Sequence, residues 1–254
     1  MIEIDIIILS FAKNEYLKGL TQQTIDTLLA SENVNNIHFN VLVIESQKSI
    51  SPYQFPGTLT LYPDEKFGFN RYMNVGIKMS NSPFVCLCNN DLIFHKGWAS
   101  EILGAMEKNK YILSANPLCE EFLPTKSVHS KTDIVVGNKA NLLNGILTGW
   151  CIFLRREIFD IIGMFDEQFE FWYADRDYGM TLLKYNVKHA LICNSRVTHL
   201  GNRSHSVMGD ENIYHFTSGQ KNIFDKKWRR SSINYIEKTI LLFKKFYRKS
   251  LMAE

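Results

Sequence analysis

The stretch from Pro83 to Asp91 constrains the fold more than any other, because an apolar run ends there abruptly in three polar side chains. Phe84 to Cys88 has no polar alternation, which is typical of a strand buried on both faces in a parallel sheet covered by helices. In open α/β sheets, ligands bind outside the carboxyl ends of such strands. Asp91 offers a hard oxygen donor of the kind that Mg²⁺ and Mn²⁺ prefer. Asn-Asn-Asp is also good turn chemistry, so the motif predicts either a turn or a ligand site.

The composition is that of an ordinary globular protein able to bury a core. With 254 residues, of which 45% are hydrophobic and 22% charged, the chain can form one large α/β domain or one domain with an appendage. The apolar run from Ile6 to Leu9 is far too short for a signal peptide or a membrane span, so we expect a cytoplasmic protein. The five cysteines form an odd number without metal-type spacing, which favours reduced, buried thiols over a metal or redox role.

Basic residues are concentrated in the C-terminal tail. Residues 221–254 contain ten Lys/Arg and three Asp/Glu, whereas residues 1–220 contain 19 and 23. The segment from Ser232 to Lys249 has a broad apolar face at helical spacing, interleaved with lysine and arginine. The pattern predicts a basic amphipathic helical extension over residues 211–254. Such a helix either packs on the domain or contacts an anionic surface, either the inner membrane face or a nucleic acid.

Strand-like and helix-like segments alternate along most of the chain, which predicts an α/β fold with a mostly parallel sheet flanked by helices. The expected strands are Ile4–Ser10, Phe39–Ile44, Thr58–Tyr62, Phe84–Cys88, Ile112–Ala115, Trp150–Leu154 and Val187–Cys193. The expected helices are Tyr16–Ala30, Phe69–Met79, Lys96–Asn109, a short one that ends before Gly163, and Tyr178–Tyr185. Pro117–Asn144 has little periodicity, and so long an irregular segment predicts a mobile functional loop.

Two further polar motifs follow expected strands. Glu45 stands just past a strand end, where an acid can accept hydrogen bonds from a ribose or a base N–H, although any such loop needs polar residues. Gly68 allows the backbone to turn or to approach a ligand closely. Arg71 and Asn74 lie at i and i+3 on one face of the helix that follows, and a helix amino end that carries an arginine is suited to bind a diphosphate.

A second dense stretch runs from Met164 to Gly179. Asp175 and Asp177 come just as a helix begins, where the helix dipole favours carboxylates. Capping alone explains one aspartate, but two acids after the aromatic cluster that contains Trp172 fit a functional site better. Trp150, at the head of its strand, is either a core residue or an aromatic platform for a sugar. His199 is either a satisfied structural group or a ligand.

Taken in this order, the motifs resemble those of the family-2 glycosyltransferases of GT-A fold, in the rhamnosyl- and glucosyltransferase-like branch. The resemblance covers residues 4 to about 203. Its most specific part is Leu-Arg-Arg-Glu-Ile-Phe-Asp-Ile-Ile-Gly-Met-Phe-Asp-Glu-Gln-Phe, followed by Asp-Arg-Asp-Tyr and Val-Thr-His-Leu-Gly. Phe-Gly-Phe-Asn-Arg-Tyr-Met-Asn-Val-Gly-Ile is similar to the family's glycine-phenylalanine loop, and Cys-Leu-Cys-Asn-Asn-Asp-Leu is similar to its metal-binding element.

The resemblance implies a role for each candidate residue. Asp91 and His199 are expected to bind Mn²⁺ or Mg²⁺, which would neutralise the diphosphate leaving group. Asp175 is expected to be the general base on the acceptor hydroxyl, with Asp177 sharing that role. Nucleotide-sugar binding is expected at Ser10, Glu45, Gly68, Arg71, Asn74, Asn89 and Asn90. Acceptor binding is expected at Trp150 and Trp172.

The chain departs from the family pattern at two positions. Ala174 stands where the family has a glutamate before the catalytic aspartate, and Glu45 stands where an aspartate is usual. Both departures bear on nucleotide and acceptor preference more than on the type of reaction.

The sequence therefore predicts a GT-A domain over residues 1–210 and a basic extension over residues 211–254. The expected function is metal-dependent, inverting transfer of a sugar from a UDP-, GDP- or dTDP-sugar to a hydroxyl of a surface glycan or lipid-linked sugar. One alternative is a bacteriophage-type DNA glycosyltransferase that modifies a hydroxylated base, for which steep salt dependence would be expected. Another is a non-catalytic nucleotide-sugar-binding scaffold. A nucleotidyltransferase is disfavoured, because no glycine-rich lysine loop follows the first strand.

Overall fold

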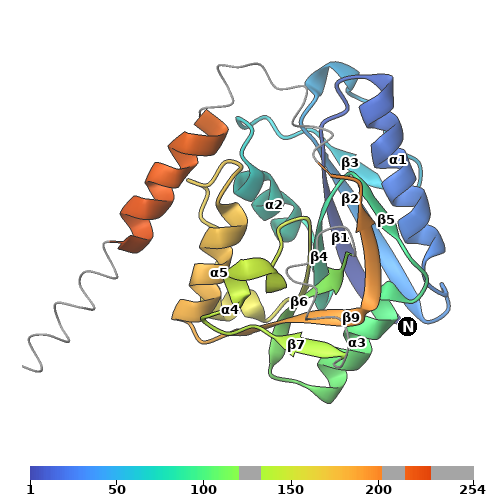
Figure 1. Ribbon diagram of the computed structural model, residues 1–254. Helices are drawn as coiled ribbons and strands as arrows, with labels where there is room; N and C mark the ends of the chain where they lie inside the picture. Colours follow the sequence, from blue (N-terminus) through green and yellow to red (C-terminus); the bar gives the residue numbers. More distant parts are fainter. Residues whose placement is uncertain (120–132, 202–214, 230–254) are drawn as a thin grey trace, which may run out of the picture.

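The computed structural model describes residues 1–119, 133–201 and 215–229. In the described chain a nine-stranded sheet lies between two layers of helices, in the strand order β3-β2-β1-β4-β8-β6-β9-β5 with β7 paired to β9 (Figure 1). The strands are β1 Ile2–Ser10, β2 Ile37–Glu45, β3 Leu59–Leu61, β4 Phe84–Asn89, β5 Leu92–Phe94, β6 Ile112–Leu118, β7 Ile134–Val136, β8 Cys151–Arg155 and β9 Lys188–His199. The helices are α1 Glu15–Ala30, α2 Phe69–Lys78, α3 Trp98–Lys108, α4 Ile158–Ile162 and α5 Ala174–Lys184, with short turns η1 Lys48–Ile50, η3 Leu142–Ile146 and η5 His215–Gly219.

The α/β class and the mostly parallel sheet are as predicted. Strand β1 pairs in parallel with β2 over nine residues and with β4 over six, without a register shift. Ser10 therefore lies opposite Glu45, and Leu9 opposite Asn89. Parallel pairing brings the carboxyl ends of these three strands to one edge of the sheet, where ligands bind in such folds.

Both faces of the central strands are buried, which explains why their sequences lack polar alternation. Ile4, Ile6 and Ile8 belong to one core with side chains of α1 and α3. Ile7 and Leu9 belong to the second core, with side chains of α2, α4 and α5. None of the described helices is both long enough and apolar enough to span a bilayer.

Strand β9 is longer than the sequence pattern predicted, because it continues past Cys193 to His199. Its first half pairs in parallel with β6, and a register shift follows before Leu118 pairs with Arg196. The last three residues of β9 pair antiparallel with β5, a strand that the sequence pattern did not predict. The extension places His199 opposite Leu92, next to Asp91.

Helix α5 begins at Ala174 rather than at Tyr178, so both aspartates lie inside its first turn. The residue before it, Tyr173, takes up a left-handed conformation with φ of 66°, which propensity alone does not predict. The expected irregular loop Pro117–Asn144 contains the end of β6, all of β7 and the start of η3. The middle of this loop, residues 120–132, lies outside the described residues, as does the predicted tail helix over residues 232–249.

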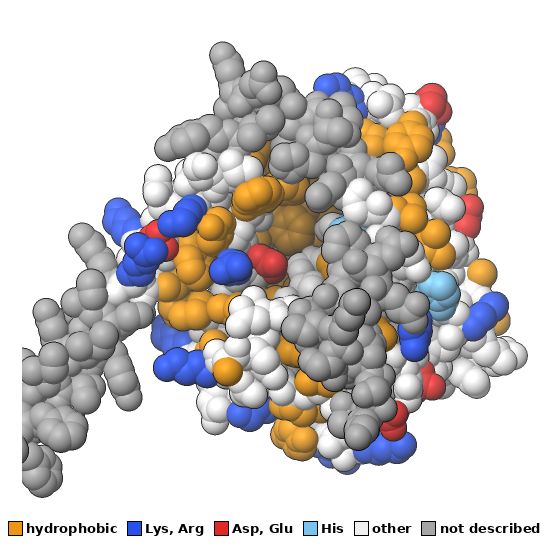
Figure 2. Space-filling view, viewed as in Figure 1, with side chains coloured by type: hydrophobic (Ala, Val, Ile, Leu, Met, Phe, Trp, Pro, Cys, Tyr) orange, Lys and Arg blue, Asp and Glu red, His pale blue; other side chains and the backbone are white. Residues whose placement is uncertain are grey.

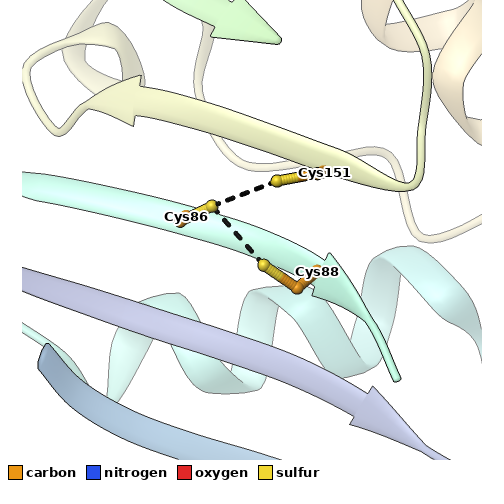
Figure 3. Close-up of side chains that lie close together, drawn as sticks. All are labelled: Cys86, Cys88 and Cys151. Atoms are coloured by element: carbon orange, nitrogen blue, oxygen red, sulfur yellow. Dashed lines mark hydrogen bonds between the residues drawn. The ribbon is translucent and has the colours of Figure 1, made fainter. Parts of the chain in front are cut away.

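Three of the five free cysteines meet in the core, although their spacing gave no such indication (Figure 3). Cys86 and Cys88 lie on one face of β4, and strand pairing puts Cys151 opposite Cys88. The Cys86 sulfur lies 3.4 Å from that of Cys88 and 3.7 Å from that of Cys151. Burial raises the pKa of Cys86 and Cys151, so these thiols pack as small protonated apolar groups.

A buried ion pair joins several elements at the opposite end of the sheet from the ligand edge. The Asp5 carboxylate accepts hydrogen bonds from the Arg156 guanidinium at 2.7 Å, from the Ser82 amide at 2.6 Å and from the Asn40 amide group at 3.2 Å. Asp5 thereby connects β1 to β2, to the segment before β4 and to the end of β8. Removing one partner would leave the other charge without compensation in a buried position.

We therefore expect Arg156→Met to lower the free energy of unfolding by roughly 3 kcal/mol, as is typical when one member of a buried ion pair is removed. Urea denaturation followed by circular dichroism measures the change. Lys110→Met is the matched control, because Lys110 and Glu107 form an exposed pair at 3.5 Å and such pairs contribute little. Equal stability losses in the two variants would contradict the structural role of the Asp5 cluster.

Candidate functional site

The segment after β4 lies at the ligand edge of the sheet, and its asparagines are anchored to neighbouring elements. The Asn89 amide donates to the Trp150 carbonyl at 2.9 Å. The Asn90 side chain is buried and donates to Thr21 Oγ1 at 2.9 Å. Ser10 Oγ also lies 2.9 Å from Thr21 Oγ1. Three of the predicted nucleotide-sugar residues thus lie together, with Thr21 of helix α1 between two of them.

Asp91 and His199 lie side by side, as the predicted metal pair requires. His199 Nε2 is 3.2 Å from Asp91 Oδ1, and the two side chains are 8% and 5% exposed. The contact follows from the pairing of β5 with β9 and from the Leu200 amide, which donates to the Asp91 carbonyl at 2.9 Å. Trp150 stacks on the His199 ring with a centroid distance of 5.6 Å and an interplanar angle of 14°.

The donor set of Asp91 and His199 fits a divalent cation. Within the described residues, Asp91 Oδ1 is buried and accepts no hydrogen bond, although its neighbours in the same segment are bonded. Besides its contact with His199 Nε2 at 3.2 Å, this buried oxygen has unused acceptor capacity, which a bound cation would fill. Mg²⁺ and Mn²⁺ sites often use one or two protein ligands and complete their coordination with substrate phosphates and water.

Glu45 is fully buried, and its carboxylate is engaged by main-chain groups. It accepts from the Ala12 amide at 3.1 Å and from the Gln47 amide at 2.6 Å. Burial raises the pKa of Glu45, and these hydrogen bonds oppose the increase. Glu45 therefore connects the loop after β1 to the loop after β2, and it fixes the shape of the edge on which a nucleotide would lie.

The amino end of α2, where the sequence pattern predicted a diphosphate site, contacts other parts of the chain. The Phe69 amide donates to the Glu170 carbonyl at 2.7 Å. The Arg71 guanidinium donates to the Lys66 carbonyl at 2.8 Å and lies 3.3 Å from Glu167. Gly68 precedes the helix in an extended conformation with φ of −165°, which any residue can adopt.

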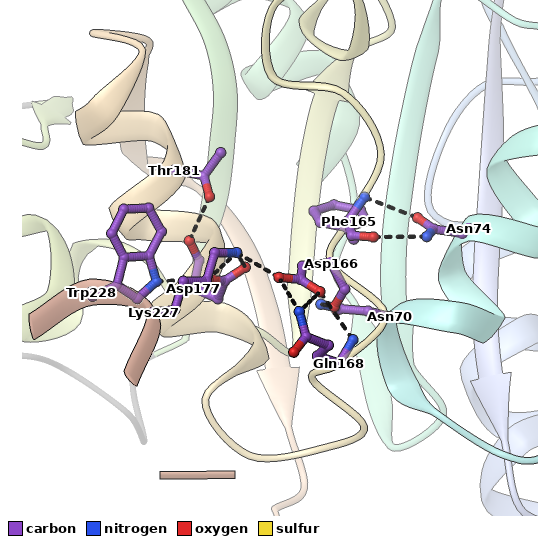
Figure 4. Close-up of polar contacts among 9 residues, drawn as sticks. All are labelled: Asn70, Asn74, Phe165, Asp166, Gln168, Asp177, Thr181, Lys227 and Trp228. Carbon is purple, nitrogen blue, oxygen red and sulfur yellow. Dashed lines mark hydrogen bonds and ion pairs between the residues drawn. The ribbon is translucent and has the colours of Figure 1, made fainter. Parts of the chain in front are cut away.

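Two asparagines of α2 hold the loop that leads to α5 (Figure 4). Asn74 is buried, donates to the Phe165 carbonyl at 2.9 Å and accepts from the Phe165 amide at 3.1 Å. Asn70 donates to the Asp166 carbonyl at 2.9 Å. These bonds satisfy buried main-chain groups of the loop, so Asn74 supports the site through this loop.

Asp175 lies in the first turn of α5 and is half-buried. Burial raises its pKa, and the 2.8 Å hydrogen bond from the Arg176 amide opposes the increase. Asp175 packs directly on Gly149, since a Cβ at Gly149 would lie 3.0 Å from Asp175 Cβ. Among the described residues, no side chain donates a hydrogen bond to its carboxylate, which suits a proton acceptor.

Asp177 differs from Asp175 in that both of its carboxylate oxygens are engaged (Figure 4). Oδ1 accepts from Trp228 Nε1 at 2.7 Å, and Oδ2 accepts from Lys227 Nζ at 3.0 Å. The side chain is only 3% exposed. Burial raises the pKa of Asp177, and Lys227 and Trp228 oppose this effect. Asp177 therefore lies in the same helical turn as Asp175, but its carboxylate is held by Lys227 and Trp228.

Gly149 and Trp150 link the two parts of the site. Gly149 touches Asp175, whereas Trp150 stacks on His199. An apolar pocket lies beneath Asp175 between α2, β4, β8 and α5, with Leu87 and Ile152 among its lining residues. Figure 2 shows a hollow with an apolar floor and with an acidic and a basic group at its rim. The predicted metal pair and the predicted base thus flank one short segment at the same edge of the sheet.

The two predicted acceptor residues differ in exposure. Trp150 is buried, and its Nε1 has no hydrogen-bond partner among the described residues. Trp172 is 48% exposed, and its amide donates to the Phe216 carbonyl at 3.2 Å. Trp172 therefore offers a ring to solvent, whereas Trp150 buries its ring against His199.

Several supporting residues were missed by the sequence analysis. Thr21 binds Ser10 and Asn90, and Thr24 exchanges hydrogen bonds with the Leu92 main chain at 3.0 Å. Buried threonines on the apolar face of a helix were the available signal for these two. The contacts of Lys227 and Trp228 with Asp177 had no such signal, because 50 residues separate the partners in sequence.

The fold agrees with that of solved glycosyltransferase structures. GalNAc-T7 with UDP, GalNAc and Mn²⁺ matches with a TM-score of 0.59 and 10% identity, over 78% of this chain and 44% of that one. Residues 1–349 of TarS from S. aureus match with a TM-score of 0.54 and 13% identity, over 77% of this chain and 59% of that one. At these identities the likeness establishes the GT-A fold alone.

Sequence comparison identifies the family. The O-antigen biosynthesis protein RfbC of Myxococcus xanthus is 24% identical in an alignment of 212 residues that covers 71% of this chain but only 16% of that protein. The chain thus spans a small part of the length of this relative. The model of the family described as Glycosyl transferase family 2 matches residues 8–163, from the end of β1 to the end of α4. This match covers more than half of the chain, which therefore belongs to glycosyl transferase family 2.

Proposed function

We propose that this protein is a metal-dependent, inverting glycosyltransferase that moves a sugar from a nucleoside-diphosphate sugar to a hydroxyl acceptor. The observation that carries the proposal is the placement of Asp175 and of the Asp91–His199 pair on either side of Gly149 and Trp150. Asp175 would accept the proton of the acceptor, and the Asp91–His199 pair would bind the cation. Proton removal and charge neutralisation are the two requirements of the reaction.

The donor would bind at the carboxyl ends of β1, β2 and β4, where Ser10 lies opposite Glu45 and the neighbouring Leu9 lies opposite Asn89. Asp91 and His199 would hold Mn²⁺ or Mg²⁺ against the diphosphate. The bound cation would supply positive charge to the leaving diphosphate. The Mn²⁺ and UDP in the GalNAc-T7 structure support a divalent cation and a uridine nucleotide as the first ones to test.

The acceptor would approach from the side of α5. The half-buried Asp175 carboxylate would accept the proton of the acceptor hydroxyl as its oxygen attacks the anomeric carbon. Attack opposite the leaving diphosphate gives inversion. The O-antigen function named for RfbC supports a surface glycan or lipid-linked sugar as the acceptor. The engaged oxygens of Asp177 leave the role of base to Asp175.

The metal pair gives the first prediction of function. Asp91→Asn keeps the shape of the side chain but removes its charge, so Mn²⁺-dependent binding of the nucleotide sugar should weaken by more than roughly 100-fold, since changes around metal ligands alone cost 10- to 100-fold. Isothermal titration with UDP-, GDP- and dTDP-sugars, with and without Mn²⁺, measures the effect. Asp160→Asn, on the exposed side of α4, is the matched control. Metal-dependent binding that survives in Asp91→Asn would refute the assignment.

The assignment of Asp175 as the general base gives the second prediction of function. Asp175→Asn should reduce kcat by roughly 10²- to 10⁴-fold, the usual contribution of a general base, while donor binding stays intact. Initial rates of transfer and donor titrations measure both quantities, again with Asp160→Asn as the control. Unchanged turnover would exclude Asp175 as the base, and a wild type that binds a nucleotide sugar but transfers none would favour the scaffold. Proton NMR of the product reports the anomeric configuration, and retention would contradict the single displacement.

The pH dependence of kcat gives the third prediction of function. Asp175 must be ionised to act, and burial raises its pKa above the ordinary value of 3.8, so kcat should fall as the pH decreases through this raised pKa. Arg176 lowers the pKa of Asp175, so Arg176→Met should shift the acidic limb of the pH profile to higher pH. Lys184→Met, at the other end of α5, should leave the limb in place. A limb that does not respond to Arg176→Met would mean that another group controls it.

A further inference from the structure

The described C-terminal segment, residues 215–229, packs beside α5 and the loop that precedes it (Figure 1). This loop, residues 163–173, is held on one side by Asn70 and Asn74 of α2. The C-terminal segment holds its other side: Gln220 is buried and accepts from the Glu170 amide at 2.8 Å. The Phe216 carbonyl accepts from the Trp172 amide, and His215 Nε2 forms a hydrogen bond with the Glu170 carboxylate.

Lys227 lies at the centre of this contact, between two acids. Its ammonium group is 2.8 Å from Asp166 in the loop and 2.8 Å from Asp177 in α5. It also lies 5.3 Å from the centre of the Phe169 ring. Trp228 is 8% exposed and donates its N–H to Asp177. One turn of the helix that occupies residues 220–229 of the described chain thereby connects the loop to the first turn of α5.

The first turn of α5 has no side-chain cap at its amino end. Tyr173, the residue before the helix, has a positive φ and makes no side-chain hydrogen bond that caps the helix. Its carbonyl accepts from the Asp177 amide at 2.8 Å. The contacts of the Asp177 side chain therefore restrain the same turn that carries Asp175, two residues earlier. Displacements of about 1 Å at a reacting group can cost a hundredfold in rate.

We propose that Lys227 and Trp228 are positioning residues for the transfer reaction, because they hold Asp177 and so fix the helical turn that presents Asp175. The inference rests on the proposed function of Asp175 and extends the site to residues beyond the segment matched by the family model. It also assigns Asp177 as the anchor of that turn. The nucleotide edge at β1, β2 and β4 shares none of these contacts, so donor binding should not depend on them.

The test compares Lys227→Met with Lys221→Met in the full-length chain. Lys221 lies on the same helix, but its Nζ pairs with Asp225 at the surface at 2.7 Å, which makes it a matched control. Lys227→Met should lower kcat by roughly 10- to 100-fold with little change in the KM for the donor. Lys227→Arg, which keeps a cation between the two acids, should restore most of kcat. An equal loss in Lys221→Met, or no rescue by arginine, would overturn the proposal.

Trp228→Phe provides a second variant in case Lys227→Met does not fold. It keeps an aromatic ring but removes the N–H that donates to Asp177. The expected result is again a lower kcat with an unchanged donor KM. A loss confined to donor KM would contradict a role in positioning Asp175.

Hydrogen–deuterium exchange separates this proposal from the proposed function. Amides of residues 163–178 should exchange faster in Lys227→Met than in the wild type and in Lys221→Met, whether or not any sugar is transferred. Unchanged exchange in these residues would overturn the positioning role even in an active enzyme. If the wild type transfers no sugar but these amides still exchange faster in Lys227→Met, the restraint of α5 by Lys227 stands and the assigned reaction is refuted.

Discussion

The parallel pairing of β1 with β2 and β4 is the constraint on which the rest of the structure depends. Parallel strands must be joined by crossover connections, and the helices in these connections cover both faces of the sheet. This arrangement requires apolar residues on both sides of β1, such as Ile6 and Ile7, which belong to the two different cores. It also gathers the loops after the three strands at one edge.

Polar side chains shape this edge because its main-chain groups are largely buried. Glu45 accepts amides from two loops, and Thr21 binds both Ser10 and Asn90. Asn74 binds both the carbonyl and the amide of Phe165, in the loop before α5. Unpaired buried polar groups are costly, so these residues also favour one loop conformation. Several residues that the family resemblance assigns to substrate binding thus make hydrogen bonds within the protein, and these bonds preorganise the edge.

The sequence allowed prediction of the parts that depend on local pattern. Phe84–Cys88 was recognised as a two-faced buried strand because periodicity is a local property. The start of α5 was misplaced by four residues, because it depends on the left-handed Tyr173 and on contacts with α2. The contact between Asp91 and His199 was expected only from the family resemblance. It depends on the pairing of β5 with the end of β9, which no local pattern reveals.

The two aspartates of α5 show why residue type and spacing alone do not assign a role. Asp175 and Asp177 share a helical turn, a dipole and a raised pKa caused by burial. They differ in what surrounds them: Asp177 binds an ammonium and an indole N–H, whereas Asp175 faces a glycine. The hydrogen bonds from Lys227 and Trp228 stabilise the ionised form of Asp177 and so make it a weaker proton acceptor. What distinguishes the surroundings of the two acids is therefore the C-terminal segment, far away in the sequence, which binds Asp177.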